Sequence, residues 1–139
     1  MALKPTEINT SKYDSSRRQI NAAIAHLHNK DFECAITLAA AAEGQLPDID
    51  VSLFRRLLKR DKDEKMNLDL NGIITWLKHP TPDKPTNATI SEFEVALTIS
   101  RAIHKFVATY AVSMREFEGF SIWAVENGHL PRQLTEPSE

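Results

Sequence analysis

Apolar residues recur every three or four positions between residues 96 and 117, and this strip is the strongest constraint on the fold. Its members are Ala96, Ile99, Ile103, Phe106, Tyr110, Met114 and Phe117. Because an α-helix turns once in about 3.6 residues, this spacing puts them on one helix face for about six turns. Thr89 and Glu92 precede the strip at capping-box spacing, which predicts a helix start there. A strip of this length is typical of a central bundle helix or of a dimer seam, and Phe117, Phe120 and Trp123 are expected to add aromatic surface to such a seam.

Helical spacing of apolar residues continues through the rest of the chain. The expected helices cover about 14–29, 31–45, a stretch after Asp50 or Ser52, 66–78 and, briefly, 120–126. Asp31 follows a short polar break and is expected to cap the second helix, so the first two helices predict an antiparallel hairpin. Only four glycines interrupt the 139 residues. The sequence therefore predicts an all-α, up-and-down helical bundle of about five helices plus a short C-terminal helix.

The chain has the length of one domain. We expect the domain to cover residues 14–130, with a flexible polar N-terminus over 1–13 and a flexible tail over 131–139. The N-terminus has no apolar core of a signal peptide, and no segment approaches the roughly 20 apolar residues of a membrane span. A single cysteine, Cys34, cannot form an internal disulfide, and we expect it to be a small core residue in a cytoplasmic protein.

The net charge of −2 argues against a nucleic-acid partner, since a basic surface would be required. The basic run over 55–62 alternates with apolar residues and is expected to be a solvated helix face. His26 and His28 are two residues apart, a poor spacing for metal ligands on a helix. Glu126 and His129 have the spacing seen in di-iron bundles but occur only once. The sequence therefore predicts no metal site and no cofactor.

Two segments resemble one known superfamily. The first is the hairpin from Ile20 to Glu43, whose second helix contains four consecutive alanines and ends in a glutamate. The second is Trp76-Leu-Lys-His79, followed by a Pro- and Asp-rich turn. Over roughly residues 20–107 the chain resembles HEPN-type helical domains, including uncharacterised bacterial proteins. The resemblance implies an up-and-down bundle that commonly dimerises, in a superfamily of RNase toxins and binding modules.

The catalytic signature of that superfamily, an arginine four to six residues before a histidine, is not present. Arg101 and His104 are separated by only two residues, and no arginine precedes His79 at the required distance. The sequence also contains no nucleophile motif or phosphate-binding loop. We therefore expect no catalytic residues and a homodimeric, non-catalytic module that binds a protein partner or a small anionic or nucleotide ligand. The alternative is a HEPN-type RNase or nucleotide-acting enzyme with a degenerate motif.

Three groups of polar residues are candidates for ligand binding. Glu43 continues a helix face that should be buried, so it must either find a partner or reach water where Gly44 opens the helix end. The second group lies at the end of the helix expected over 66–78, just before a stiff proline-rich loop. A ligand bound there would contact Asn71, Trp76, Lys78 and His79. Lys78 and His79 could equally serve only to offset the helix dipole. The third is a secondary patch of Arg101, His104 and Lys105, which periodicity predicts to face solvent.

Overall fold

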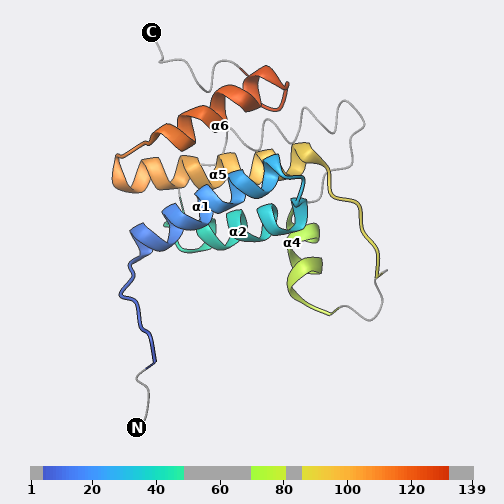
Figure 1. Cartoon of the computed structure of the whole chain (residues 1–139). Coiled ribbons are helices and arrows are strands. Elements are labelled where there is room, and N and C mark those ends of the chain that lie inside the picture. Colours follow the sequence, from blue (N-terminus) through green and yellow to red (C-terminus); the bar gives the residue numbers. More distant parts are fainter. Residues whose placement is uncertain (1–4, 49–69, 81–85, 132–139) are drawn as a thin grey trace.

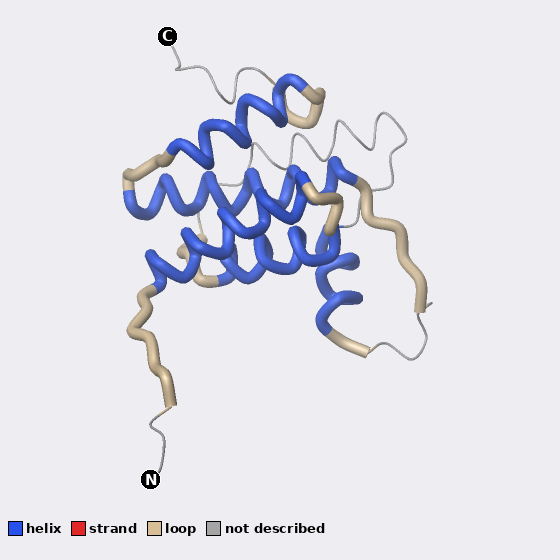
Figure 2. The backbone as a smooth tube through the Cα atoms, in the orientation of Figure 1, coloured by secondary structure: helices blue, strands red, loops and turns tan. Residues whose placement is uncertain are grey.

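The described part of the chain is a bundle of helices in the computed structural model (Figure 1). The helices are α1 (Lys12–His28), α2 (Phe32–Gly44), α4 (Leu70–Lys78), α5 (Glu92–Tyr110) and α6 (Arg115–Glu126). The structure describes residues 5–48, 70–80 and 86–131, and none of them forms a strand (Figure 2). The predicted all-α bundle is confirmed. The helix expected after Asp50, the basic run over 55–62 and the first residues of the helix expected over 66–78 lie outside the described residues.

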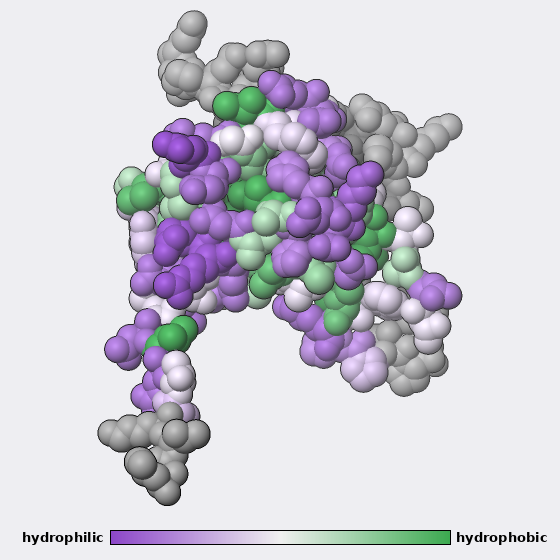
Figure 3. All heavy atoms as spheres, viewed as in Figure 1, coloured by the Kyte–Doolittle hydropathy of each residue, from purple (hydrophilic) through white to green (hydrophobic). Residues whose placement is uncertain are grey.

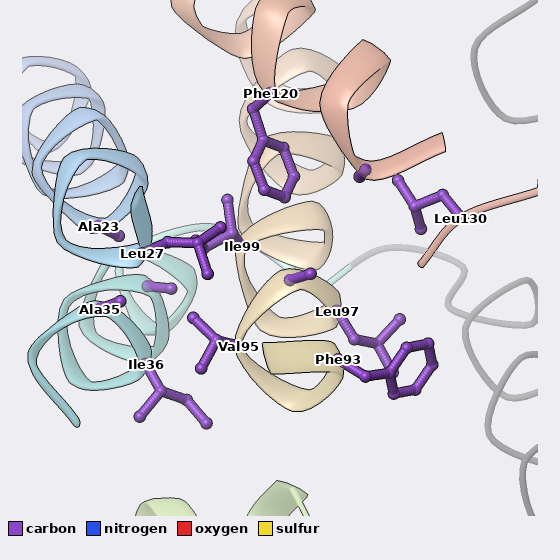
Figure 4. Packing of buried hydrophobic residues seen from close by; sticks show 13 residues of the cluster. Ala23, Leu27, Ala35, Ile36, Phe93, Val95, Leu97, Ile99, Phe120 and Leu130 are labelled. Carbon is purple, nitrogen blue, oxygen red and sulfur yellow. The ribbon is translucent and has the colours of Figure 1, made fainter. Parts of the chain in front are cut away.

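The predicted hairpin of the first two helices is present, and its interface consists mostly of small side chains. Ala23 and Leu27 of α1 meet Ala35, Ile36 and Ala39 of α2 in one buried cluster (Figure 4). Asp31 is the N-cap residue of α2, as expected, but its side chain makes no capping bond. Its carboxylate instead lies 3.3 Å from Nδ1 of His26, because the tight turn brings that ring back beside it.

The central helix of the bundle is α5. Every residue from 93 to 100 is buried, which an amphipathic surface helix would not show. α1 and α2 pack along α5, and α6 crosses over α5 and α1 (Figure 1). Polar groups inside this helix bond locally: Thr98 donates to the carbonyl of Glu94 at 2.8 Å, and Ser100 to that of Ala96 at 2.8 Å. The buried stretch therefore leaves both of these hydroxyl groups hydrogen-bonded.

The capping box of α5 lies two residues later than the sequence suggested. Ser91 accepts from the backbone N–H of Glu94 at 3.1 Å, and the Glu94 carboxylate accepts from the N–H of Ser91 at 3.1 Å. The expected pair of Thr89 and Glu92 is therefore wrong. Glu92 instead contacts Nε2 of His129 at 2.7 Å, so its carboxylate does not turn back towards Thr89.

The expected continuous helix through residue 117 is broken. α5 ends at Tyr110, Ala111 has a left-handed backbone (φ 54°, ψ 34°), and α6 starts at Arg115. The break turns α6 back over the bundle, so Phe117 and Phe120 are buried at 1% and 2% exposure. Trp123, the third expected surface aromatic, is half-buried between His28 and His129. The aromatic surface expected for a dimer seam is thus largely covered by the chain itself.

Cys34 is exposed, so the expectation of a core cysteine is wrong. The residue follows Glu33 on the outer face of α2, while Ala35 and Ile36 supply the buried contacts of that turn. Among the described helices, none is both long and apolar enough to cross a membrane.

The ends of α1 and α6 offer a matched test of backbone strain. Both close with a left-handed residue: Lys30 (φ 64°) after α1 and Gly128 (φ 76°) after α6. At each end the same two bonds form, from Lys30 to Leu27 and Asp31 to His26, and from Gly128 to Val125 and His129 to Ala124. A side chain raises the energy of this conformation, whereas glycine adopts it freely.

We expect Lys30→Gly to raise the free energy of unfolding by about 1 kcal/mol and Gly128→Ala to lower it by a similar amount. Urea denaturation followed by circular dichroism measures both changes. An added methyl group at Gly128 meets no atom within 4 Å, so a loss there reports the backbone alone. Destabilisation by Lys30→Gly would show that the lysine side chain contributes more than the strain it introduces.

Candidate functional site

Three charged side chains from α2 and α5 meet in the interior of the bundle. Nε of Arg101 lies 3.1 Å from each oxygen of Glu43, and its Nη2 lies 2.7 Å from Oε2. Nζ of Lys105 lies 3.0 Å from Oε1 of the same carboxylate. Both oxygens of Glu43 thus accept charge-assisted hydrogen bonds from Arg101, and Oε1 also forms an ion pair with Lys105. We call Glu43, Arg101 and Lys105 the ionic triad.

Helix geometry explains why these residues meet. Arg101 and Lys105 are four residues apart on α5, so they share one face on successive turns. Ala39 and Ala42 of α2 are fully buried, and their small side chains let α2 approach α5 closely. Glu43 in the last turn of α2 then reaches between the two cations. Two like charges at this spacing repel each other unless an anion lies between them.

The triad is largely shielded from water. The side chains of Glu43, Arg101 and Lys105 are 12%, 16% and 9% exposed. Of the two outcomes left open for Glu43, the structure shows the one in which it finds a partner. The expectation that Arg101 and Lys105 face solvent is wrong, because α2 covers the side of α5 on which they lie.

A fourth charge lies at the outer edge of the triad. Oδ1 of Asp48, in the segment after α2, lies 3.4 Å from Nζ of Lys105. The Asp48 side chain is 101% exposed, so it reaches Lys105 from the solvent side. Two cations and two anions therefore meet here. One of the anions, Asp48, is exposed to solvent and pairs only with Lys105 among the described residues. His104 is exposed beside this face, and Thr109, also exposed, donates to the carbonyl of Lys105 at 2.7 Å.

The second expected group does not join Glu43. α4 lies near the N-terminal end of α2, where Ile73, Ile74 and Leu77 pack against the cluster containing Ile36 (Figure 1). Glu43 lies at the opposite end of the same helix, next to Ala42, which belongs to a second buried cluster with Ile20 and Phe106. Glu43 and the helix end at Lys78, both expected to bind a ligand, therefore lie in two separate places.

The helix end at Lys78 has the form expected from its sequence. Lys78 is the last residue of α4, and the N–H of His79 still donates to the carbonyl of Thr75 at 3.0 Å. Both side chains are exposed and Trp76 is half-buried. The side chain of Asn71 and residues 81–85 lie outside the described residues. A role for this corner in binding stays a prediction.

A second polar contact escaped the sequence analysis. Nε2 of His129 lies 2.7 Å from Oε1 of Glu92 and joins the end of α6 to the start of α5. The His129 ring packs between Phe93 and Trp123, with ring centroids 5.9 Å and 5.4 Å away. No spacing rule links residues 37 positions apart, and sequence reasoning paired His129 with Glu126 instead.

His26 and His28 point to different partners, Asp31 and the Trp123 ring. Over residues 5–48, 70–80 and 86–131, no group of three His, Cys, Asp or Glu side chains could hold a metal ion. No protein-family model matches the chain, and no curated protein or solved structure matches it either. Among the described residues, the ionic triad is therefore the feature from which a function is inferred.

Removing the carboxylate of Glu43 should destabilise the protein strongly. Glu43→Gln leaves two shielded cations side by side with no anion between them, so we expect the free energy of unfolding to fall by about 3 kcal/mol. Denaturant unfolding of both proteins measures this loss. The control is Glu33→Gln, which removes an exposed carboxylate from the first turn of the same helix and should change stability by less than about 0.5 kcal/mol.

Replacing the whole triad by apolar residues separates charge from packing. The triple variant Glu43→Met, Arg101→Leu, Lys105→Met has no unpaired charge and should recover most of the stability that Glu43→Gln loses. A triple variant as unstable as Glu43→Gln would contradict this explanation and show that the loss comes from packing.

Proposed function

We propose that this chain is a non-catalytic helical module that binds a carboxylate of an acidic protein segment at Lys105, on the outer edge of the ionic triad. The observation that carries the proposal is the contact between Nζ of Lys105 and the fully exposed carboxylate of Asp48. It shows that a carboxylate approaching from solvent fits this position. In the absence of a partner, Asp48 occupies the position that an acidic side chain of the partner takes when it binds.

The charges of the site support this proposal. Glu43 neutralises one of the two cations, and Asp48 is the only other anion that contacts them among the described residues. When Asp48 moves away, one positive charge is left uncompensated at the outer edge of the triad. Because Lys105 is held by Glu43, its ammonium group is positioned in advance and loses little freedom when it binds a new anion.

The same contacts support a binding role over catalysis. A general base needs a free lone pair directed at its substrate, whereas both oxygens of Glu43 already accept hydrogen bonds from Arg101, and Oε1 also pairs with Lys105. Membership of the HEPN superfamily, a homodimeric state and a cytoplasmic location belong to the same proposal. They rest on the sequence resemblance and on the lone cysteine.

An oligoglutamate peptide tests the binding site. Titration followed by NMR should show shifts centred on Lys105 and on the end of α2. Asp48→Asn should tighten binding several-fold, since it removes the competing carboxylate. Lys105→Met should weaken binding about tenfold, the effect of one lost charge-assisted contact, while the two-oxygen contact of Arg101 with Glu43 keeps the fold.

Glu33→Gln is the matched control for Asp48→Asn. It removes the same charge from the far end of α2 and should leave the affinity for the peptide unchanged. Equal binding by Lys105→Met and the unaltered protein would overturn the proposal. So would tighter binding of inorganic phosphate or a nucleotide than of the peptide at the same position.

We expect the pure protein to leave RNA intact. Two nitrogens of the Arg101 guanidinium donate to Glu43, while His104 is exposed on the outside of α5, so the pair is not arranged as a joint catalytic site. Incubation of labelled RNA with and without EDTA, read on a gel, measures cleavage. Metal-independent cleavage that disappears in His104→Ala or His79→Ala would support the HEPN-type RNase alternative instead.

A further inference from the structure

The turn between α5 and α6 lacks the glycine or proline that normally ends a helix, and its one capping-type residue, Ser113, is not the N-cap of α6. No glycine or proline occurs between residues 91 and 118. Ala111 adopts a left-handed backbone without being Gly or Asn, which raises its energy. Met114 is the N-cap of α6 and its side chain makes no capping bond. The local sequence therefore favours a continuous helix where the structure has a break.

The apolar strip crosses the break without a change of spacing. Tyr110, Met114 and Phe117 are four and three residues apart, and the strip continues to Phe120 and Ala124. If α5 and α6 formed one helix, these residues would all lie on the same face. Spacing of this kind is what two long helices packed side by side require.

The contacts that α6 makes do not depend on which copy of the chain supplies it. α6 doubles back over α5 and buries Phe117, Phe120 and Ala124, and Figure 4 shows the Phe120 ring pointing from α6 towards Ile99. His129 adds its contact with Glu92. A second copy offers the same surface, so its α6 can make every one of these contacts.

We propose that two copies of this chain exchange α6, with α5 and α6 of each copy joined into one continuous helix. The proposal deepens the self-association named under the proposed function and rests on it. The two long helices run antiparallel about a twofold axis at residues 111–114, and each α6 packs on the α5 and α1 of the other copy. Ala111 then becomes an ordinary helical residue.

An exposed apolar residue lies at the point where the axis would pass. Val112 is 39% exposed, one of three large hydrophobic residues exposed in the described part of the chain. Figure 3 shows a hydrophobic spot at the edge of the molecule where Figure 1 has the turn between α5 and α6. In the exchanged dimer the two copies of Val112 lie near each other and can cover one another.

The free-energy difference between the closed monomer, in which α6 packs on its own chain, and the exchanged dimer has few contributions. The core contacts are the same in both, so they cancel. Exchange removes the strain at Ala111 and adds helical hydrogen bonds, and it costs the freedom lost when two chains associate. Short, strained turns favour this kind of exchange. Concentration therefore decides which form is present.

Light scattering across a concentration series measures the dimer, and two variants test the turn. Ala111→Gly relieves the strain of the closed form and weakens the continuous helix, so the dimer dissociation constant should rise at least about tenfold. Gly119→Ala is the control: the residue lies inside α6 in both forms and an added methyl group meets nothing within 4 Å. It should leave that constant unchanged, and an equal change in both variants would overturn the proposal.

Crosslinking distinguishes exchange from other dimers. In the variant Cys34→Ser, Glu92→Cys, His129→Cys, a short bismaleimide joins the two positions within one chain in the closed form and between two chains in the exchanged form. Covalent dimers on a denaturing gel, from concentrations at which light scattering gives a dimer, support exchange. A dimer that crosslinks only within chains overturns exchange and leaves self-association standing. A monomer at every concentration overturns both, and the peptide titration at Lys105 is unaffected by either result.

Discussion

The bundle depends on the burial of the first half of α5, residues 93–100, on every side. A helix in this position can hold few polar groups, and each needs a partner within the protein. Thr98 and Ser100 bond back to their own helix, and Glu94 closes the capping box. Arg101 and Lys105 cannot be satisfied in this way, since a charge shielded from water requires an opposite charge as well as a hydrogen bond. They require an anion from another element, and α2 supplies it through Glu43.

The ionic triad fixes how α2 is placed along α5, in an interface whose other contacts are nearly the same from turn to turn. The α2 surface against α5 includes Ala35, Ala39 and Ala42, which allow close packing but differ little from turn to turn. Glu43 can reach both cations in only one register of α2 against α5. A slip of one turn would leave buried charges unpaired. The same constraint holds the ammonium group of Lys105 where the exposed carboxylate of Asp48 can reach it from solvent. Structural and binding roles of this residue therefore have one physical origin.

The candidate site was only partly predictable. Sequence reasoning selected Glu43, Arg101 and Lys105, because a carboxylate on a buried face and cations on a core helix are unusual. It placed them in two separate groups, since the residues are 58 positions apart and periodicity reports a face without naming its neighbour. The link between His129 and Glu92 carried no sequence signal at all. Asp48 was not considered, because an exposed aspartate in a loop is ordinary.

Local chemistry determined that this chain is helical. Spacing of three and four, few glycines and the turn at residues 29–31 specified the α1–α2 hairpin and the central helix, because these features act within a few residues of each other. The break at Ala111 was decided by tertiary structure alone. No glycine or proline occurs from Tyr110 to Met114 to end a helix, and the chain turns there because doing so buries Phe117, Phe120 and Leu130 against the rest of the bundle. Each fully buried side chain of this size contributes about 1.5–3 kcal/mol, which exceeds the roughly 1–2 kcal/mol cost of one left-handed alanine.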